Sequence, residues 1–327
     1  MAIASIALTA CSATNEPIEE LDAGTPFTWA YGTGAVGGTS YNIGAAQAEA
    51  VRASGSHVTL IAEETAGGPS NVTRLANGEL QMAFIQASEV YAGLNGTGNF
   101  EATGAVTGLE LAWAGTEGGV GIVAPSSTGI TSYADLCGRK LGTTSAGAKT
   151  NLDALLTSAG VDSDCIDWQI GATYDQMVTA MADGTLDAAG LIGIPVAAGS
   201  ATLQAAETME INFVSADPAD KEKHDAMFPY WPLSTVPAGS FPGQTNDWLI
   251  AGFYQALYTS SAVPEQQVYE AVKALSETSA ACTAIQAGCG QFTLERTAEV
   301  FLKTGIAIAP PHAGLVRLLE EAGIDYK

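Results

Sequence analysis

The stretch WAYGTGAVGGTSYNIGAAQAEA, Trp29–Ala50, decides the fold of this chain. A short apolar strand runs into a loop with four glycines and no charged side chain, and a helix follows from Tyr41. Backbone N–H groups at the start of a helix carry a partial positive charge and suit a carboxylate or another anion. A tight turn that only needs glycine is the alternative. The loop predicts contacts to a small molecule from Gly38, Thr39, Ser40 and Tyr41.

The same order of strand, loop and helix returns in KLGTTSAGAKTNL, Lys140–Leu152. N–H groups at this second helix start would hold a carboxylate, each contact contributing ~0.3–1 kcal/mol when exposed and up to ~2 kcal/mol when partly buried. Lys149 either adds a full positive charge or points to solvent. Two such loops in one chain indicate a small molecule held between two lobes, and not catalysis. The contacts predicted here are Ser145, Ala146, Gly147, Ala148 and Lys149.

Strands and helices alternate along the chain, which predicts mostly parallel sheets flanked by helices. Two units repeat this pattern, and they share a similar phrase, NGELQMAFIQ at 77–86 and DGTLDAAGLI at 183–192. We therefore predict an α/β fold of two similarly built lobes. The expected strands are 27–31, 57–62, 81–86, 109–125, 136–142, 167–170 and 187–192, and the expected helices are 42–54, 71–77, 148–159 and 174–183.

The lobe boundaries follow from two irregular or glycine-rich passages. We assign residues 26–114 and 236–327 to lobe I and residues 115–235 to lobe II, with hinge crossings at 115–125 and 212–235. The return passage is rich in proline, which interrupts regular elements. Further helices are expected at 247–260, 264–278 and 293–303, with a final helix from His312 or Ala313 to Glu321.

Composition excludes some partners. The formal net charge is −23, with 14% charged and 47% hydrophobic residues. Without a basic stripe to neutralise phosphates, nucleic acid is not expected as a partner, and neither is direct binding to anionic membranes. The simplest explanation of the acidity is solubility in a salty medium. Salt screens charges beyond a Debye length of about 8 Å, so distant carboxylates still permit an anionic ligand in a shielded cleft.

The first residues have the pattern of an exported lipoprotein. Leu8–Cys11 resembles a lipobox after a short apolar run, and an acidic segment follows. We predict the end of a signal peptide at 1–11, lipidation of Cys11, a tether over 12–25 and an extracytoplasmic location. A cleavable leader with an unrelated cysteine is the alternative. The basic residues expected earlier are missing, so we expect the true start upstream of Met1. No apolar run of about 18 residues predicts a spanning helix.

The other four cysteines predict up to two disulfides, with three possible pairings. We favour the pairs that are closest in sequence, Cys137 with Cys165 and Cys282 with Cys289. A zinc site is disfavoured because no histidine lies at ligand spacing from a cysteine. We expect no metal and no cofactor.

Two amides and one histidine complete the candidates. Asn71 and Gln86 follow or end predicted strands, and each either contacts the ligand or caps a local element. His312 is expected to cap its Pro-Pro turn. A hydrolase needs a nucleophile, a base and an orienting group within reach. The sequence has no Gly-x-Ser-x-Gly elbow and no metal-ligand spacing, so an enzyme is not expected.

Several segments match motifs of a known family. Gly37–Tyr41 is similar to its GGTYY-like loop, with serine at the first tyrosine, and Pro237–Gln244 is similar to its PAGTYPGQ. Gly67–Asn71 and Gln86–Glu89 are looser matches to its Gly-Gly-Ser-x-x-Asn and Gln-Ser-Asp segments. Two alanines in Ser145–Ala148 replace the hydroxyls of its Gly-Ser-Gly-Thr helix start, and Pro311–Gly314 is similar to its His-Pro-Gly-Ala segment.

Over about Phe27 to Tyr326, the chain resembles the TAXI-type solute receptors of tripartite ATP-independent periplasmic (TRAP) transporters. The resemblance implies a two-lobed, type II-like periplasmic-binding-protein fold that closes on an organic anion or amino acid, glutamate-like or a dicarboxylate. It also implies delivery to sodium-driven TRAP membrane subunits, which are often fused. A binding lipoprotein of an ATP-driven (ABC) importer, or a sensory binding protein, is the alternative, and gene neighbours would separate these.

Overall fold

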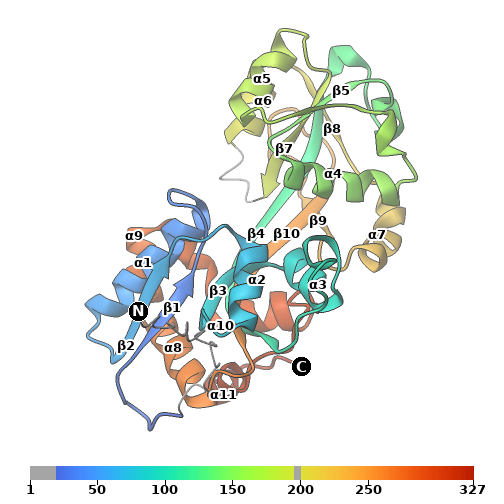
Figure 1. The fold of residues 1–327 in the computed structure, drawn as a ribbon. Helices are drawn as coiled ribbons and strands as arrows, with labels where there is room; N and C mark the ends of the chain where they lie inside the picture. The colour runs from blue at the N-terminus through green and yellow to red at the C-terminus, as the bar shows by residue number, and fades with distance from the viewer. Residues whose placement is uncertain (1–19, 195–199) are drawn as a thin grey trace, which may run out of the picture.

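The computed structural model describes residues 20–194 and 200–327. It has two lobes joined by two long antiparallel strands, β4 (Leu109–Pro125) and β10 (Trp248–Ser260), which run through both (Figure 1). Cys11, the predicted leader at 1–11 and residues 12–19 of the predicted tether lie outside the described residues. Within them, no helix is long and apolar enough to cross a membrane, and no group of three or more His, Cys, Asp or Glu side chains could hold a metal ion.

Lobe I begins with the strand–loop–helix unit that the sequence indicated. Three parallel strands lie in the order β2-β1-β3, and β10 pairs antiparallel with β3. Helices cover most of the inner strands β1 and β3, whereas the edge strand β2 alternates buried and exposed side chains. The elements are β1 (Phe27–Gly32), α1 (Thr39–Ala53), β2 (Val58–Glu63), α2 (Gly68–Ala76), β3 (Met82–Gln86) and α3 (Ala87–Asn95).

Lobe II repeats this arrangement. Its parallel strands lie in the order β6-β5-β7, and β4 pairs antiparallel with β7. The two similar phrases in the sequence form the equivalent strands β3 and β7. The prediction of two similarly built α/β lobes is confirmed. The elements are β5 (Lys140–Thr143), α4 (Ala146–Ser158), β6 (Asp167–Ile170), α5 (Tyr174–Ala182), β7 (Ala188–Ile194), α6 (Ser200–Thr208), β8 (Ile211–Val214), α7 (Lys221–Met227) and β9 (Leu233–Val236).

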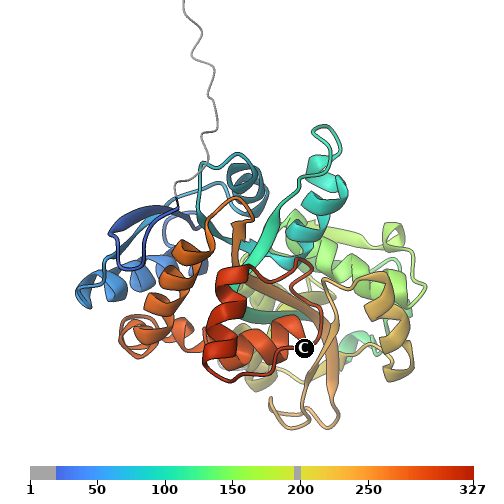
Figure 2. The ribbon, with the colours of Figure 1, turned by 90° about the horizontal axis from the view of Figure 1, so that it is seen from below.

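The C-terminal helices return to lobe I, where Figure 2 shows them in orange and red beside its blue elements. The final helix was predicted correctly, and the His312 side chain caps it by accepting a hydrogen bond from Gly314 N at 3.1 Å. The elements are α8 (Glu265–Glu277), α9 (Ser279–Ile285), α10 (Leu294–Arg296) with a π-helical turn (Thr297–Leu302), and α11 (Ala313–Glu321).

The helix predicted at 247–260 is wrong, because this segment forms β10. Its residues WLIAGFYQALYTS are mostly buried, and a continuous apolar run does not distinguish a buried strand from a buried helix. The return crossing therefore lies in β10, and not at 212–235 as expected. Residues 212–235 instead contain β8, α7 and β9, which pair with or pack on lobe II.

Buried side chains show where one lobe passes into the other. On β4 the core of lobe I includes Ala114, while Val120 belongs to a core of lobe II. On β10 the change falls between Ala251 and Ala256. Residues 236–250, which the sequence assigned to lobe I, contribute Val236, Phe241, Trp248 and Ile250 to a lobe II core with α5 and β7.

The crossing strands approach each other closely at Gly115. A Cβ there would overlap the backbone of Gln255 on β10, so glycine permits this contact. A break in the strand register lies beside it, between Gln255 and Leu257. Bulges bend strands and increase their twist. The connection between the lobes is therefore a two-stranded ribbon with a built-in irregularity.

Both predicted disulfides are present. Cys137–Cys165 joins the segments that precede β5 and β6 in lobe II. Cys282–Cys289 closes a short loop after α9 in lobe I. Among the described cysteines, each lobe therefore has one disulfide, and neither disulfide joins the two lobes.

Candidate functional site

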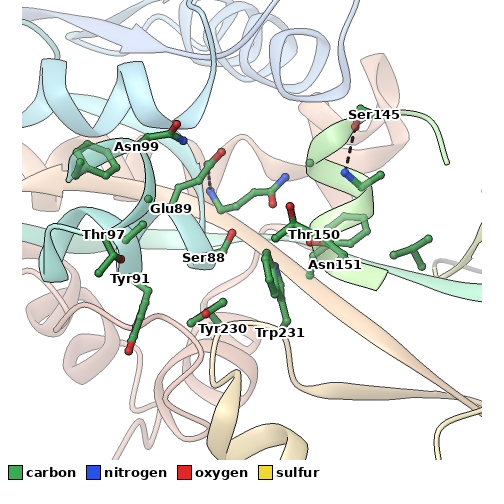
Figure 3. Close-up of a pocket in the computed structure, with 18 of the residues that line it drawn as sticks. Ser88, Glu89, Tyr91, Thr97, Asn99, Ser145, Thr150, Asn151, Tyr230 and Trp231 are labelled. Carbon is green, nitrogen blue, oxygen red and sulfur yellow. Dashed lines mark hydrogen bonds between the residues drawn. The ribbon is translucent and has the colours of Figure 1, made fainter. Parts of the chain in front are cut away.

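A cavity of about 660 Å³ lies between the lobes, beside the crossing strands. Figure 3 shows its two facing sides: Glu89, Tyr91, Thr97 and Asn99 come from lobe I, and Ser145, Thr150 and Asn151 come from lobe II. Val120 on β4 and Phe253 on β10 also line it. Because both lobes supply walls, any change in the angle between them changes this cavity.

The lobe I side is built by α3, which starts immediately after β3. Gln86, the last residue of β3, has an extended backbone, and its N–H donates to the Glu89 carboxylate at 3.1 Å. This bond satisfies one of the N–H groups that every helix start leaves without an intrahelical partner. Gln86, Ser88, Glu89 and Tyr91 all face the cavity.

Glu89 is the only charged side chain among the described residues that line the cavity. A Cβ at Gly68 would overlap its carboxylate, so the carboxylate lies against the start of α2. Burial raises the pKa of Glu89 above its ordinary value, and the hydrogen bond from Gln86 N partly offsets this rise in pKa. A half-buried carboxylate without a cationic partner gains from a positive charge placed beside it.

The lobe II side is the N-terminal turn of α4. Ser145 is its N-cap, and the Ser145 hydroxyl oxygen accepts a hydrogen bond from Ala148 N at 3.1 Å. Ser145, Gly147 and Ala148 line the cavity. Lys149 does not, because its Nζ pairs with Asp153 at 2.5 Å and lies 4.6 Å from the centre of the Trp168 ring. The helix start therefore offers partial positive charge without a full cation.

Aromatic rings form the third wall. The Tyr91 and Tyr230 ring centres lie 4.5 Å apart, and those of Tyr230 and Trp231 lie 5.0 Å apart. His224 holds the Trp231 backbone, with Nε2 at 2.8 Å from the Trp231 carbonyl oxygen. Trp231 is 9% exposed, and its buried Nε1 has no hydrogen-bond partner. The indole N–H is therefore a donor that is enclosed by protein and has no acceptor in the structure.

Other predicted site residues lie elsewhere. Asn71 is fully buried, and its Nδ2 donates to the Thr33 and Phe84 carbonyl oxygens at 3.0 and 2.9 Å, which ties α2 to β1 and β3. The loop before α1 lies at the edge of lobe I that faces lobe II (Figure 1). Gly38 and Thr39 are exposed there, and the Ser40 hydroxyl donates to Gln255 Oε1 at 3.0 Å.

The cavity thus brings together Gln86, Ser145, Gly147 and Ala148 from the predicted set, with Ala146 at the first position of α4. It does not include Gly38, Thr39, Ser40, Tyr41, Asn71 or Lys149. Sequence reasoning missed Glu89 and Tyr91 as cavity residues, whereas Tyr230 and Trp231, in the proline-rich passage, were candidates for either the hinge or the cleft. A signal existed for Glu89, which stands three residues after the strand-end Gln86. No local pattern places a tyrosine and a tryptophan between α7 and β9 beside α3.

Three solved structures are similar to this chain. The sulfonate-binding protein SsuA from Methylobacillus flagellatus KT is 13% identical, with 91% of this chain and 96% of that chain covered and a TM-score of 0.52. Alkanesulfonate-binding SsuA from Xanthomonas axonopodis pv. citri is 17% identical, with 91% and 85% covered and a TM-score of 0.43. Aliphatic sulphonate-binding SsuA from Escherichia coli is 16% identical, with 80% of each chain covered and a TM-score of 0.44. Identities this low bear on fold alone.

A family model supplies the closer relationship. The model described as the NMT1-like family matches residues 31–323, which include both lobes and both crossing strands. The chain therefore belongs to the NMT1-like family and has the two-lobed α/β fold of periplasmic binding proteins.

Proposed function

We propose that this protein is an extracytoplasmic solute receptor that captures a small organic solute between its lobes and delivers it to a membrane transporter. The observation that carries the proposal is the cavity of about 660 Å³ with walls from both lobes. Ligand sites of proteins commonly have volumes of roughly 300–1,000 Å³ and lie between domains. A solute that contacts both walls would stabilise a closed arrangement over an open one.

Binding is favoured over catalysis by the chemistry of the walls. Among the described lining residues there is no His, Cys or Lys, and the one carboxylate has no second acid or base beside it. Nucleophilic and acid–base catalysis both need such groups within hydrogen-bond reach of one another. The walls instead offer hydroxyls, amides, aromatic rings and a helix start, which are groups that hold a solute.

The ligand class in this proposal is an organic anion or an amino acid. The first turn of α4 favours a solute with an anionic group, because the free N–H groups at a helix start bind negative charge. We further propose that closure brings residues 38–41 over the solute. The equivalence of α1 and α4 in the two lobes supports this, since each follows the middle strand of its parallel trio.

The proposed transporter is a sodium-coupled TRAP system, on the strength of the sequence motifs, and Cys11 is the proposed lipid anchor. An ABC importer is the second candidate, and it is supported by the Methylobacillus flagellatus KT neighbour, which is named as part of a putative sulfonate ABC transporter. A receptor encoded beside paired TRAP membrane subunits belongs to the first system. A receptor encoded beside an ATPase and a permease belongs to the second.

Native mass spectrometry combined with small-angle scattering tests receptor function. The ligand-stripped protein is offered a pool of amino acids, betaines, amines, and di- and tricarboxylates. We expect a stoichiometric adduct and a smaller radius of gyration when that compound is added alone. A bound compound without compaction would remove the hinge closure from the proposal. No adduct from the whole pool would remove the receptor function for these solute classes.

A further inference from the structure

The charge of the cavity walls is unevenly divided between the lobes. Lobe I contributes the Glu89 carboxylate, and lobe II contributes the first turn of α4 with Ser145 and Gly147. The nearest candidate cation in sequence, Lys149, pairs with Asp153 and not with a cavity group. One side of the cavity is therefore negative and the opposite side carries the partial positive charge of a helix start.

We propose that the solute carries a cationic nitrogen, which pairs with Glu89 of lobe I, and an anionic group, which the first turn of α4 in lobe II binds. This inference rests on the proposed receptor function and names the solute class: zwitterions with a primary or alkylated ammonium group. It assigns Glu89 as the residue that selects them. Dicarboxylates are excluded, because their second carboxylate would face Glu89.

The aromatic wall is the second observation that supports a cation. Tyr91, Tyr230 and Trp231 lie in ring contact along the cavity, close to the α3 segment that carries Glu89. The faces of such rings attract ammonium groups, and tryptophan is the strongest of them. The combination of aromatic faces with one carboxylate is a chemistry suited to an alkylated ammonium, which offers few or no N–H groups for hydrogen bonds.

The Glu89 carboxylate lies against Gly68, so a substitution of this glycine tests the position of the carboxylate separately from its charge. Because a Cβ at position 68 would overlap the Glu89 carboxylate, Gly68→Ala displaces the carboxylate while keeping its charge. The overlapping group is the end of a flexible side chain, so it can move without unfolding α2. Glu89→Gln removes the charge but keeps an oxygen for the bond from Gln86 N. Glu101→Gln, an exposed residue of the same lobe, is the matched control.

The first experiment uses the same pool of compounds in native mass spectrometry. Adducts from compounds with a cationic nitrogen and an anionic group support the inference. Adducts only from dicarboxylates or tricarboxylates overturn it and leave receptor function intact. No adduct from any compound overturns receptor function for these solute classes, and the inference with it.

The second experiment measures the affinity of the compound so identified by calorimetry. We expect Glu89→Gln to weaken binding at least about thirtyfold, Gly68→Ala about fivefold and Glu101→Gln not at all, on the scale where each tenfold is about 1.4 kcal/mol. Folding of each variant is checked by its thermal unfolding. Wild-type affinity in a folded Glu89→Gln variant would overturn the assignment of Glu89.

Discussion

The two lobes are built alike but do not contribute alike to the cavity. In each lobe, three parallel strands lie in the same order beside a long crossing strand, with β10 next to β3 and β4 next to β7. By this order α1 corresponds to α4. Yet α4 presents its first turn to the cavity, whereas the loop before α1 is largely exposed and α3 provides the wall of lobe I.

The difference shows how a repeated architecture produces an asymmetric site. In lobe I the side chains of Glu89 and Tyr91 come from the helix after β3, the strand that pairs with β10. In lobe II the contacts come from the start of a helix one strand further from the crossing. Two lobes with the same topology thus offer opposite local charge, which suits a solute with two unlike ends.

The largest effect that we predict concerns what stabilises each lobe. The core of lobe I is one cluster, while buried side chains of lobe II form two. Cys137 and Cys165 are 28 residues apart, and the loop-entropy model assigns a bridge of that span about 3.6 kcal/mol. Replacing both cysteines with alanine should lower the free energy of unfolding, measured in urea, by about this amount. A loss under about 1 kcal/mol would contradict a dependence of lobe II on its bridge.

The second prediction asks which helix start binds the anionic group. An aspartate at Gly147, in the first turn of α4, should weaken solute binding by about thirtyfold, or ~2 kcal/mol, because it places negative charge where the anion lies. A helix start favours aspartate, so folding is retained. Thr39→Asp, at the first position of α1, is the matched variant. Equal losses in the two variants would show that both helix starts act on the anion.

The third prediction concerns closure. If residues 38–41 move over the bound solute, Tyr41→Ala should weaken binding about tenfold, or ~1.4 kcal/mol. Tyr41 is partly exposed and does not line the cavity in this structure. It would contact the solute only after the lobes close. Calorimetry of the folded variant decides the point. Unchanged affinity would show that α3, and not residues 38–41, supplies the lobe I contacts to the solute.

Much of the fold could be predicted because glycine loops and apolar strands are local signals. The units before α1 and α4 were recognised from their sequence, and the disulfides from the spacing of four cysteines. The failure at 247–260 has a physical cause. A strand buried on both faces has no alternating pattern. Two of its three partners, β3 and β4, lie more than a hundred residues away along the chain, and only β9 is near.

The site was harder to predict for a related reason. The contacts at α4 are local to one helix start, so the sequence indicates them. The wall of Tyr91, Tyr230 and Trp231 depends on two segments that meet only through the arrangement of the lobes. Lys149 was an even choice between ligand and solvent. In this structure its Nζ contacts Asp153, one turn along the helix, and the Trp168 ring on β6.

The smallest effect that we predict is on the pH dependence of stability, and it concerns one buried histidine in each lobe. His224 Nε2 lies 2.8 Å from the Trp231 carbonyl oxygen, and His312 Nε2 lies 3.0 Å from that of Val263. Burial lowers the pKa of both below the ordinary value, while these backbone hydrogen bonds partly oppose the fall in pKa. The unfolded chain therefore takes up protons below about pH 6.5 where the native protein does not. Stability is complete above that pH and decreases as the pH falls below it.

The second ring nitrogen makes the two histidines unequal. Nδ1 of His224 faces the Ser158 hydroxyl. When Nδ1 is protonated, this hydroxyl can rotate so that its oxygen accepts a hydrogen bond from Nδ1–H. Nδ1 of His312 accepts from Gly314 N, so its protonation breaks the cap of α11. We therefore expect His312→Gln to flatten the decrease in urea stability between pH 7.5 and 5.5 more than His224→Gln does. The reverse order would show that the hydroxyl of Ser158 cannot rotate, and that lobe II holds its histidine more rigidly than lobe I.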